Sequence, residues 1–183
     1  MLLPNYKIKT DDIIDFLKAK RPKVHLEFGS GSTDSMKYAM KKFSENKCSE
    51  SWGLDEIECK TYLGATSENL EDLKESALKT IKEYNIDRIC VHTPEFAFSI
   101  SKYDLNKEYR SLIVASLLAA ARTFVKLNLK AAKILPIASV EPVKEKIGYY
   151  NFCLVPSLIN KFPQVLTGIG DGFAAVQAVK VLS

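Results

Sequence analysis

Closely spaced cysteines are missing from this sequence of 183 residues. Its four cysteines, Cys48, Cys59, Cys90 and Cys153, form no C-x-x-C pair, which excludes a zinc or dithiol site of that type. Cys90 and Cys153 lie within apolar runs, where a buried thiol behaves as a small hydrophobic side chain. We therefore expect buried, reduced thiols.

Long hydrophobic runs and blocks of like charge are also missing. The longest apolar run, residues 111–121, is too short to cross a bilayer, and the N-terminus has no basic and apolar pattern typical of a signal peptide. The net charge of +4 is spread over alternating acids and bases, which indicates a solvated surface rather than a nucleic-acid patch. These absences predict a cytoplasmic protein that binds neither membrane nor nucleic acid.

Alternating strand and helix patterns run through the chain, and its length suits a single domain, 1–183. They predict a three-layer α/β fold with a mostly parallel sheet. Strands are expected within 23–29, at the start of 51–63, and within 86–93, 96–102 and 148–156. Helices are expected within 10–21, 29–47, 67–84, 107–127 and 172–182. Thr10 and Ser67 are the expected caps of the first and third of these helices, and 130–146 is the expected long loop.

A glycine-rich turn stands immediately before the last expected helix: Gly168, Ile169, Gly170 and Asp171. Backbone N–H groups at a helix start attract anions, and glycine lets a ligand approach them closely. Asp171 could cap the helix. It could equally take the proton from a hydroxyl that attacks a phosphate held by those amides. The turn alone leaves both interpretations open.

Four segments in order resemble the ADP-dependent sugar kinases, the archaeal-type glucokinases and phosphofructokinases with a ribokinase-like (Rossmann-like) fold. VHLEFG (24–29) resembles the His-x-Glu strand of that family, and SWGLDEIE (51–58) resembles its Asn-x-x-Glu segment with aspartate in place of asparagine. IDRICVHT (86–93) resembles the strand that ends in His-Thr, and 154–175 resembles the closing segment with Gly-x-Gly-Asp. The resemblance covers 23–183 and implies the C-terminal part of such a kinase, without the N-terminal half and lid.

The resemblance also implies roles in catalysis and nucleotide binding. Asp171 matches the catalytic base, and the backbone of Gly168, Ile169 and Gly170 matches the anion hole for the transferred phosphate. His92 matches a histidine near the nucleotide. The main chain of Ile159 and Asn160 matches the adenine contacts.

Two acids match the residues that place Mg²⁺ and its waters around the phosphates, namely Glu27 and Glu58. Mg²⁺ prefers oxygen ligands and is often held through waters by one or two carboxylates. Each residue has a simpler alternative: Glu58 as helix surface, and His92 as a hydrogen-bonded strand histidine. For His25 we favour that structural role, with a side chain pointing away from Glu27.

The implied activity is transfer of the terminal phosphate of ADP to glucose or fructose 6-phosphate, leaving AMP, as a step of carbohydrate metabolism such as glycolysis. The sequence leaves three alternatives open. The chain is a kinase or the C-terminal portion of one, a truncated homologue that binds ADP or AMP without turnover, or a subunit that pairs with another chain. That other chain would be a second copy or a complementing N-terminal chain, because half an α/β sheet leaves an exposed edge.

Overall fold

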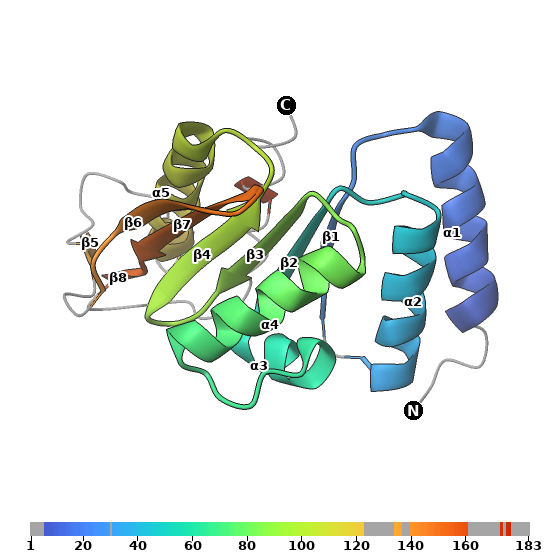
Figure 1. The fold of residues 1–183 in the computed structure, drawn as a ribbon, viewed down its shortest axis with the longest axis horizontal. Coiled ribbons are helices and arrows are strands. Elements are labelled where there is room, and N and C mark those ends of the chain that lie inside the picture. The colour runs from blue at the N-terminus through green and yellow to red at the C-terminus, as the bar shows by residue number, and fades with distance from the viewer. Residues whose placement is uncertain are drawn as a thin grey trace. The chain divides into compact units, whose positions relative to one another are not determined.

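The computed structural model describes residues 6–29, 31–122, 134–136, 140–160, 173, 175 and 176. The chain divides into two compact units, an N-terminal unit (Met1–Ile89) and a C-terminal unit (Cys90–Ser183). The main sheet has six strands in the order β1-β2-β3-β4-β7-β6, and β5 and β8 form a second sheet (Figure 1). The α/β class is therefore confirmed, whereas the single domain over 1–183 stays a prediction.

Helices and strands alternate in the N-terminal unit, where β1 and β2 pair in parallel. Its elements are α1 (Tyr6–Lys20), β1 (His25–Glu27), α2 (Thr33–Glu45), β2 (Ser51–Asp55), α3 (Glu56–Glu58), a π-helical turn (Cys59–Leu63), α4 (Leu70–Glu83) and the start of β3 (Arg88–His92). The expected change from strand to helix within 51–63 is present. Ser32 caps α2, because its side chain accepts a hydrogen bond from the Ser35 amide.

Strand alternation separates an apolar face from a polar face in this unit. Leu26 of β1 packs against a cluster of Ile14, Phe43 and Cys48. Because successive side chains of a strand point to opposite faces, the two neighbours of Leu26 face away from that cluster. The side chain of Trp52 in β2 is fully buried.

Antiparallel pairing prevails in the C-terminal unit, where β4 pairs with β7 and β7 with β6. Its elements are β4 (Phe96–Ser101), α5 (Leu105–Arg122), β5 (Ile134–Pro136), β6 (Val143–Ile147), β7 (Tyr150–Pro156) and β8 (Leu158–Asn160). We expect a mostly parallel sheet from the sequence; the described pairs make it mixed, parallel between β1 and β2 and antiparallel here.

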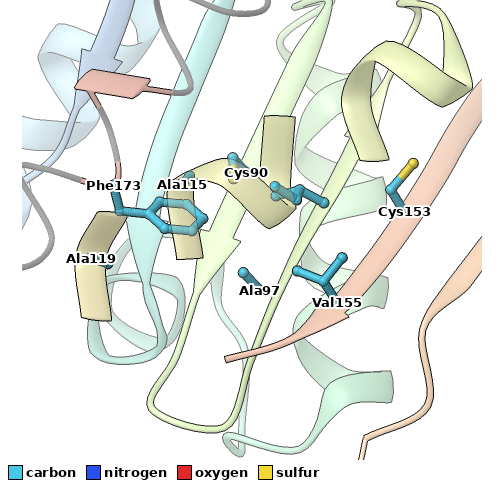
Figure 2. Packing of buried hydrophobic residues seen from close by; sticks show 8 residues of the cluster. Cys90, Ala97, Ala115, Ala119, Cys153, Val155 and Phe173 are labelled. Atoms are coloured by element: carbon cyan, nitrogen blue, oxygen red, sulfur yellow. The ribbon is translucent and has the colours of Figure 1, made fainter. Parts of the chain in front are cut away.

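One hydrophobic cluster joins α5 to the sheet of the C-terminal unit. Figure 2 shows the ring of Phe173 beside Ala115 of this cluster. The buried members are Cys90, Ala97, Leu112, Ala115, Ala119, Cys153, Val155 and Phe173. The four cysteines of the chain are all buried thiols rather than disulfides, as expected. Within the described segments, no helix combines the length and apolar composition needed to cross a membrane.

Three local predictions are wrong. Thr10 lies inside α1 and its hydroxyl donates to the Tyr6 carbonyl at 2.8 Å, because threonine can bond the carbonyl four residues earlier. Asn69, not Ser67, caps α4. The expected loop 130–146 contains β5 and most of β6.

The cap of α4 gives the first testable prediction. The Asn69 side-chain oxygen accepts a hydrogen bond from the Asp72 amide at 2.9 Å, so Asn69→Ala should lower the free energy of unfolding by about 1 kcal/mol. Asn69→Ser keeps an acceptor and should lower it less. Urea unfolding of both variants measures the difference. An unchanged free energy of unfolding in Asn69→Ala would contradict the assignment of the cap.

Candidate functional site

Acidic side chains gather where β1 and β2 end. Glu27 ends β1, and Asp55 ends the parallel neighbour β2, just before Glu58. The Asp55 carboxylate accepts from the Glu58 amide at 2.7 Å, and the Glu58 carboxylate accepts from the Asp55 amide at 2.9 Å. This reciprocal capping box starts α3. It also holds the Glu58 carboxylate at the end of the sheet.

The carboxylate of Glu58 is half-buried and lies among other acids. Burial, followed by the charges of Asp55, Glu27 and Glu56, raises the pKa of Glu58 to about 7. The capping hydrogen bond from the Asp55 amide opposes this shift. Glu27 and Glu58, 31 residues apart in the sequence, therefore interact electrostatically.

His25 lies on the same face of β1 as Glu27. Its Nε2 is 3.2 Å from Glu27 Oε2, and its Nδ1 is 2.8 Å from the Ser51 hydroxyl oxygen. The expectation that His25 points away from Glu27 is wrong, because residues two apart on a strand share a face. The expected hydrogen-bonded strand histidine is present.

Gly53 leaves the space in which these side chains meet. It is the cross-strand neighbour of Glu27. A Cβ at this position would lie 2.0 Å from Glu27 Oε2 and 2.9 Å from His25 Nε2. Sequence reasoning missed Gly53, although the alternation of small and large residues in Ser-Trp-Gly-Leu was a signal for it.

A tyrosine anchors the loop that follows β1. The Tyr62 hydroxyl donates to the Gly29 carbonyl at 3.1 Å and accepts from the Gly31 amide at 3.3 Å. Tyr62 belongs to the π-helical turn after α3. The segments that follow β1 and β2 are therefore tied together.

Two carboxylates at one strand end fit the needs of a magnesium ion. The described residues contain no group of three or more His, Cys, Asp or Glu side chains placed to hold a metal. Mg²⁺ does not require such a group, since it is often held by one or two carboxylates and waters. Burial is the main cause of the raised pKa of Glu58, and the neighbouring acids Asp55, Glu27 and Glu56 add to it; a cation would relieve the repulsion among these acids. The role of Glu27 and Glu58 toward such an ion stays a prediction.

In the C-terminal unit, His92 and the start of β8 are linked through Thr93. The Thr93 amide and hydroxyl both bond the Phe96 carbonyl in the turn between β3 and β4. Ser157, which immediately precedes β8, donates its hydroxyl to the Thr93 carbonyl at 2.9 Å. The His92 ring lies 5.1 Å from that of Phe173, centroid to centroid. Phe96 is buried.

Both predicted adenine contacts lie in β8. Ile159 pairs with Leu135 and Asn160 with Ile134 in the antiparallel β5–β8 sheet. A cavity of about 130 Å³ lies next to β8 and is lined by residues of α5, β7 and β8, including Ser116 and Leu158. It is smaller than the ~300 Å³ at which ligand pockets begin. A larger hollow of about 630 Å³ follows the first turns of α5 and contains none of the predicted site residues.

The predicted anion hole and base lie outside the described residues. These are Gly168, Ile169, Gly170 and Asp171. Their roles stay predictions. Phe173, two residues beyond Asp171, is described as helical and buried.

The pKa of Glu58 predicts how stability depends on pH. Because the folded protein keeps this proton up to about pH 7 and the unfolded chain loses it near 4.5, a rise in pH through that window should destabilise the fold. Glu58→Gln keeps the capping acceptor without the charge, so its stability should fall less between about pH 5 and about pH 8. The difference should stay below ~1.4 kcal/mol per unit of pKa shift, since water screens a half-buried group.

Urea unfolding at the two pH values measures this effect. Glu75→Gln, on the exposed face of α4, is the matched control and should follow the wild type. Parallel pH profiles for wild type and Glu58→Gln would show that the charge of Glu58 is not destabilising.

The space at Gly53 gives a further prediction. Gly53→Ala should displace the Glu27 carboxylate and press on the His25 ring, with a loss of about 1 kcal/mol in the free energy of unfolding. Gly29→Ala is the control, because its Cβ would meet nothing within 4 Å. NMR of the His25 ring and urea unfolding should both change in the first variant only. An unchanged His25 spectrum in Gly53→Ala would contradict this geometry.

Comparisons with known proteins agree on one family. The family model described as "ADP-specific Phosphofructokinase/Glucokinase conserved region" matches residues 6–179. A comparison with curated proteins found no match.

Several solved structures share the fold. The last common ancestor of ADP-dependent phosphofructokinases from Methanosarcinales is 21% identical, with a TM-score of 0.79 over 95% of this chain and 45% of that chain. An ADP-dependent kinase in complex with fructose-6-phosphate and ADPβS is 20% identical. Its TM-score is 0.79, and the match covers 95% of this chain and 48% of that chain. A phosphofructokinase from Pyrococcus horikoshii OT3 with AMP is 22% identical. Its TM-score is 0.72, and the match covers 97% of this chain and 46% of that chain.

The chain thus spans just under half the length of these solved structures. At such identities the likeness concerns the fold, whereas the family model covers nearly the whole chain. The His-x-Glu strand, the acidic helix start and the His-Thr strand end all occur within the matched region. The chain belongs to the ADP-specific phosphofructokinase/glucokinase family.

Proposed function

We propose that this chain is the nucleotide-binding and catalytic-base portion of an ADP-dependent sugar kinase. It would transfer the terminal phosphate of ADP to a hydroxyl of a hexose or hexose phosphate, such as glucose or fructose 6-phosphate, and leave AMP. The observation that carries the proposal is the family match over residues 6–179. Solved relatives bound to ADPβS with fructose-6-phosphate, and to AMP, support the choice of ligands.

The base and anion hole of the proposed reaction lie in the glycine turn. The amides of Gly168, Ile169 and Gly170 would hold the transferred phosphate, and Asp171 would accept the proton of the attacking hydroxyl. Such preorganised donors stabilise charge that develops in the transition state.

The nucleotide would be held by main chain and by His92. Among the described residues β8 pairs with β5 alone, so the other edge of β8 offers backbone groups for adenine. This recognition depends on the backbone and not on the side chains of Ile159 and Asn160. The hydrogen bond from Ser157 to Thr93 supports a common placement of β8 and His92.

Glu27 and Glu58 would hold Mg²⁺, which when bound neutralises charge on the phosphates. The interaction between the two carboxylates supports this role. Burial, the first cause of the rise in the pKa of Glu58 to about 7, favours this role over that of a fully solvated helix-surface acid.

A second candidate is a nucleotide-binding subunit without turnover of its own. A second copy or a complementing N-terminal chain would then supply the lid and most sugar contacts. Glycolysis is the proposed context and the cytoplasm the proposed location.

Calorimetry with ADP and Mg²⁺, together with a sugar phosphorylation assay, tests the proposal. Binding with phosphorylation of glucose or fructose 6-phosphate supports the kinase. Binding without phosphorylation supports the subunit. Absence of ADP binding would contradict both.

The base is tested by Asp171→Asn. Loss of a general base should reduce the phosphorylation rate by roughly 10²–10⁴-fold, while ADP affinity should change little because the amides that hold the phosphate remain. Asp12→Asn, on the exposed surface of α1, is the matched control and should keep the wild-type rate. A normal rate in Asp171→Asn would show that another group accepts the proton.

A further inference from the structure

A chain of hydrogen bonds crosses the first three strands and ends at a proposed metal-binding acid. Arg88 Nη1 donates to the Ser51 hydroxyl oxygen at 3.1 Å. The same oxygen is 2.8 Å from His25 Nδ1. On the other side of the ring, His25 Nε2 is 3.2 Å from Glu27 Oε2. We propose that Ser51 and Arg88 are positioning residues that fix the Glu27 carboxylate through a single tautomer of His25.

The hydrogen bond between His25 and Glu27 determines which group donates in each of these hydrogen bonds. An ionised carboxylate only accepts hydrogen bonds, so His25 Nε2 must carry the ring proton to bond Glu27. In the neutral imidazole, Nδ1 is then an acceptor. The Ser51 hydroxyl at 2.8 Å is therefore a donor to Nδ1.

Arg88 completes this direction from the other end. A guanidinium can only donate, so it occupies a lone pair of the Ser51 oxygen and leaves the hydroxyl proton for His25. Each group then donates to the next, from Arg88 to Glu27. The opposite tautomer would place a lone pair of Nε2 against the carboxylate, which is repulsive.

Burial decreases along this series of hydrogen-bonded side chains, from Arg88 in the interior to Glu27 at the site. Arg88 is 0% exposed and Ser51 is 1% exposed, the His25 side chain is 6% exposed, and the Glu27 side chain is 28% exposed. The inner members are held by the core. A glutamate at the end of a strand has many rotamers, and this bond orients one of its oxygens.

The inference rests on the proposed function, since it gives Glu27 a role toward Mg²⁺. Hydrogen-bond partners behind a ligating side chain orient it, and their loss typically costs about 10–100-fold in metal affinity. Ser51 touches neither the ion nor the nucleotide in this scheme. It acts only through the His25 ring.

Nitrogen-15 NMR of the histidine rings tests the tautomer without any assay of activity. The chain has only two histidines, so the His25 signals are assigned by comparison with His25→Gln. At about pH 8.5, above the usual titration of histidine, wild-type His25 should be the Nε2–H tautomer with a hydrogen-bonded Nδ1. In Ser51→Ala no hydroxyl donates to Nδ1. The Nδ1 signal should therefore shift toward that of a ring nitrogen that accepts no hydrogen bond.

A matched control exists in the same sheet. Ser99 is a fully buried strand serine whose hydroxyl has no hydrogen-bond partner among the described residues. Ser99→Ala should leave the His25 signals unchanged. If Ser51→Ala does not fold, as judged by circular dichroism, Ser51→Cys repeats the test with a weak donor of similar size.

Calorimetric titration with Mg²⁺ tests the effect on Glu27. Ser51→Ala should bind Mg²⁺ about 10–100-fold more weakly than the wild type. Ser99→Ala should bind Mg²⁺ with the affinity of the wild type. Ser51→Thr keeps the hydroxyl, so its affinity should stay within a few-fold of the wild-type value. Unchanged affinity in a folded Ser51→Ala would overturn the positioning role.

The two measurements separate the inference from the proposed function. An Nδ1–H tautomer in wild-type His25 overturns the directed chain whether or not Mg²⁺ binds. A wild-type chain that binds no Mg²⁺ yet shows the Nε2–H tautomer supports the hydrogen-bond chain and overturns the metal role proposed for Glu27.

Discussion

The parallel register between β1 and β2 is the constraint on which the N-terminal site depends. It sets His25 opposite Ser51 and Glu27 opposite Gly53, with the large side chains of the same strands turned to the other face. Moving one strand by a single residue would exchange the two faces and bury the acids against the helices. The hydrophobic packing that fixes the register therefore also fixes the polar constellation.

Much of this organisation could be predicted from the sequence, because strands of alternating or continuous apolar residues and amphipathic helices have clear periods. The strand-to-helix change after β2 and the buried cysteines follow from local pattern. The predicted helix starts at Thr10 and Ser67 were wrong. Several polar residues near each helix start can cap the helix or form a hydrogen bond within its first turn, and tertiary contacts determine which of them is the cap. The antiparallel β6 was missed because its described side chains are mostly exposed.

The site shows the same division between local and long-range information. Glu27 and Glu58 could be proposed from the sequence because the segments around them resemble motifs of the family. Ser51 and Arg88 could not be found in this way, since a serine or an arginine in a strand has no chemical signature until the neighbouring strand is known. His25 was misdirected by an error in strand geometry, and the register corrects it.

The π-helical turn after α3 has a consequence for how this region can vary. A π turn contains one residue more than an α-helix needs, and Gly64, with φ of 80°, closes it. Deleting a residue between Cys59 and Tyr62 would shorten the turn and move the Tyr62 side chain from its present position. Gly29 and Gly31 would then lose their hydrogen bonds to the Tyr62 hydroxyl, so the extra residue acts as a spacer for contacts with residues about thirty positions earlier in the sequence.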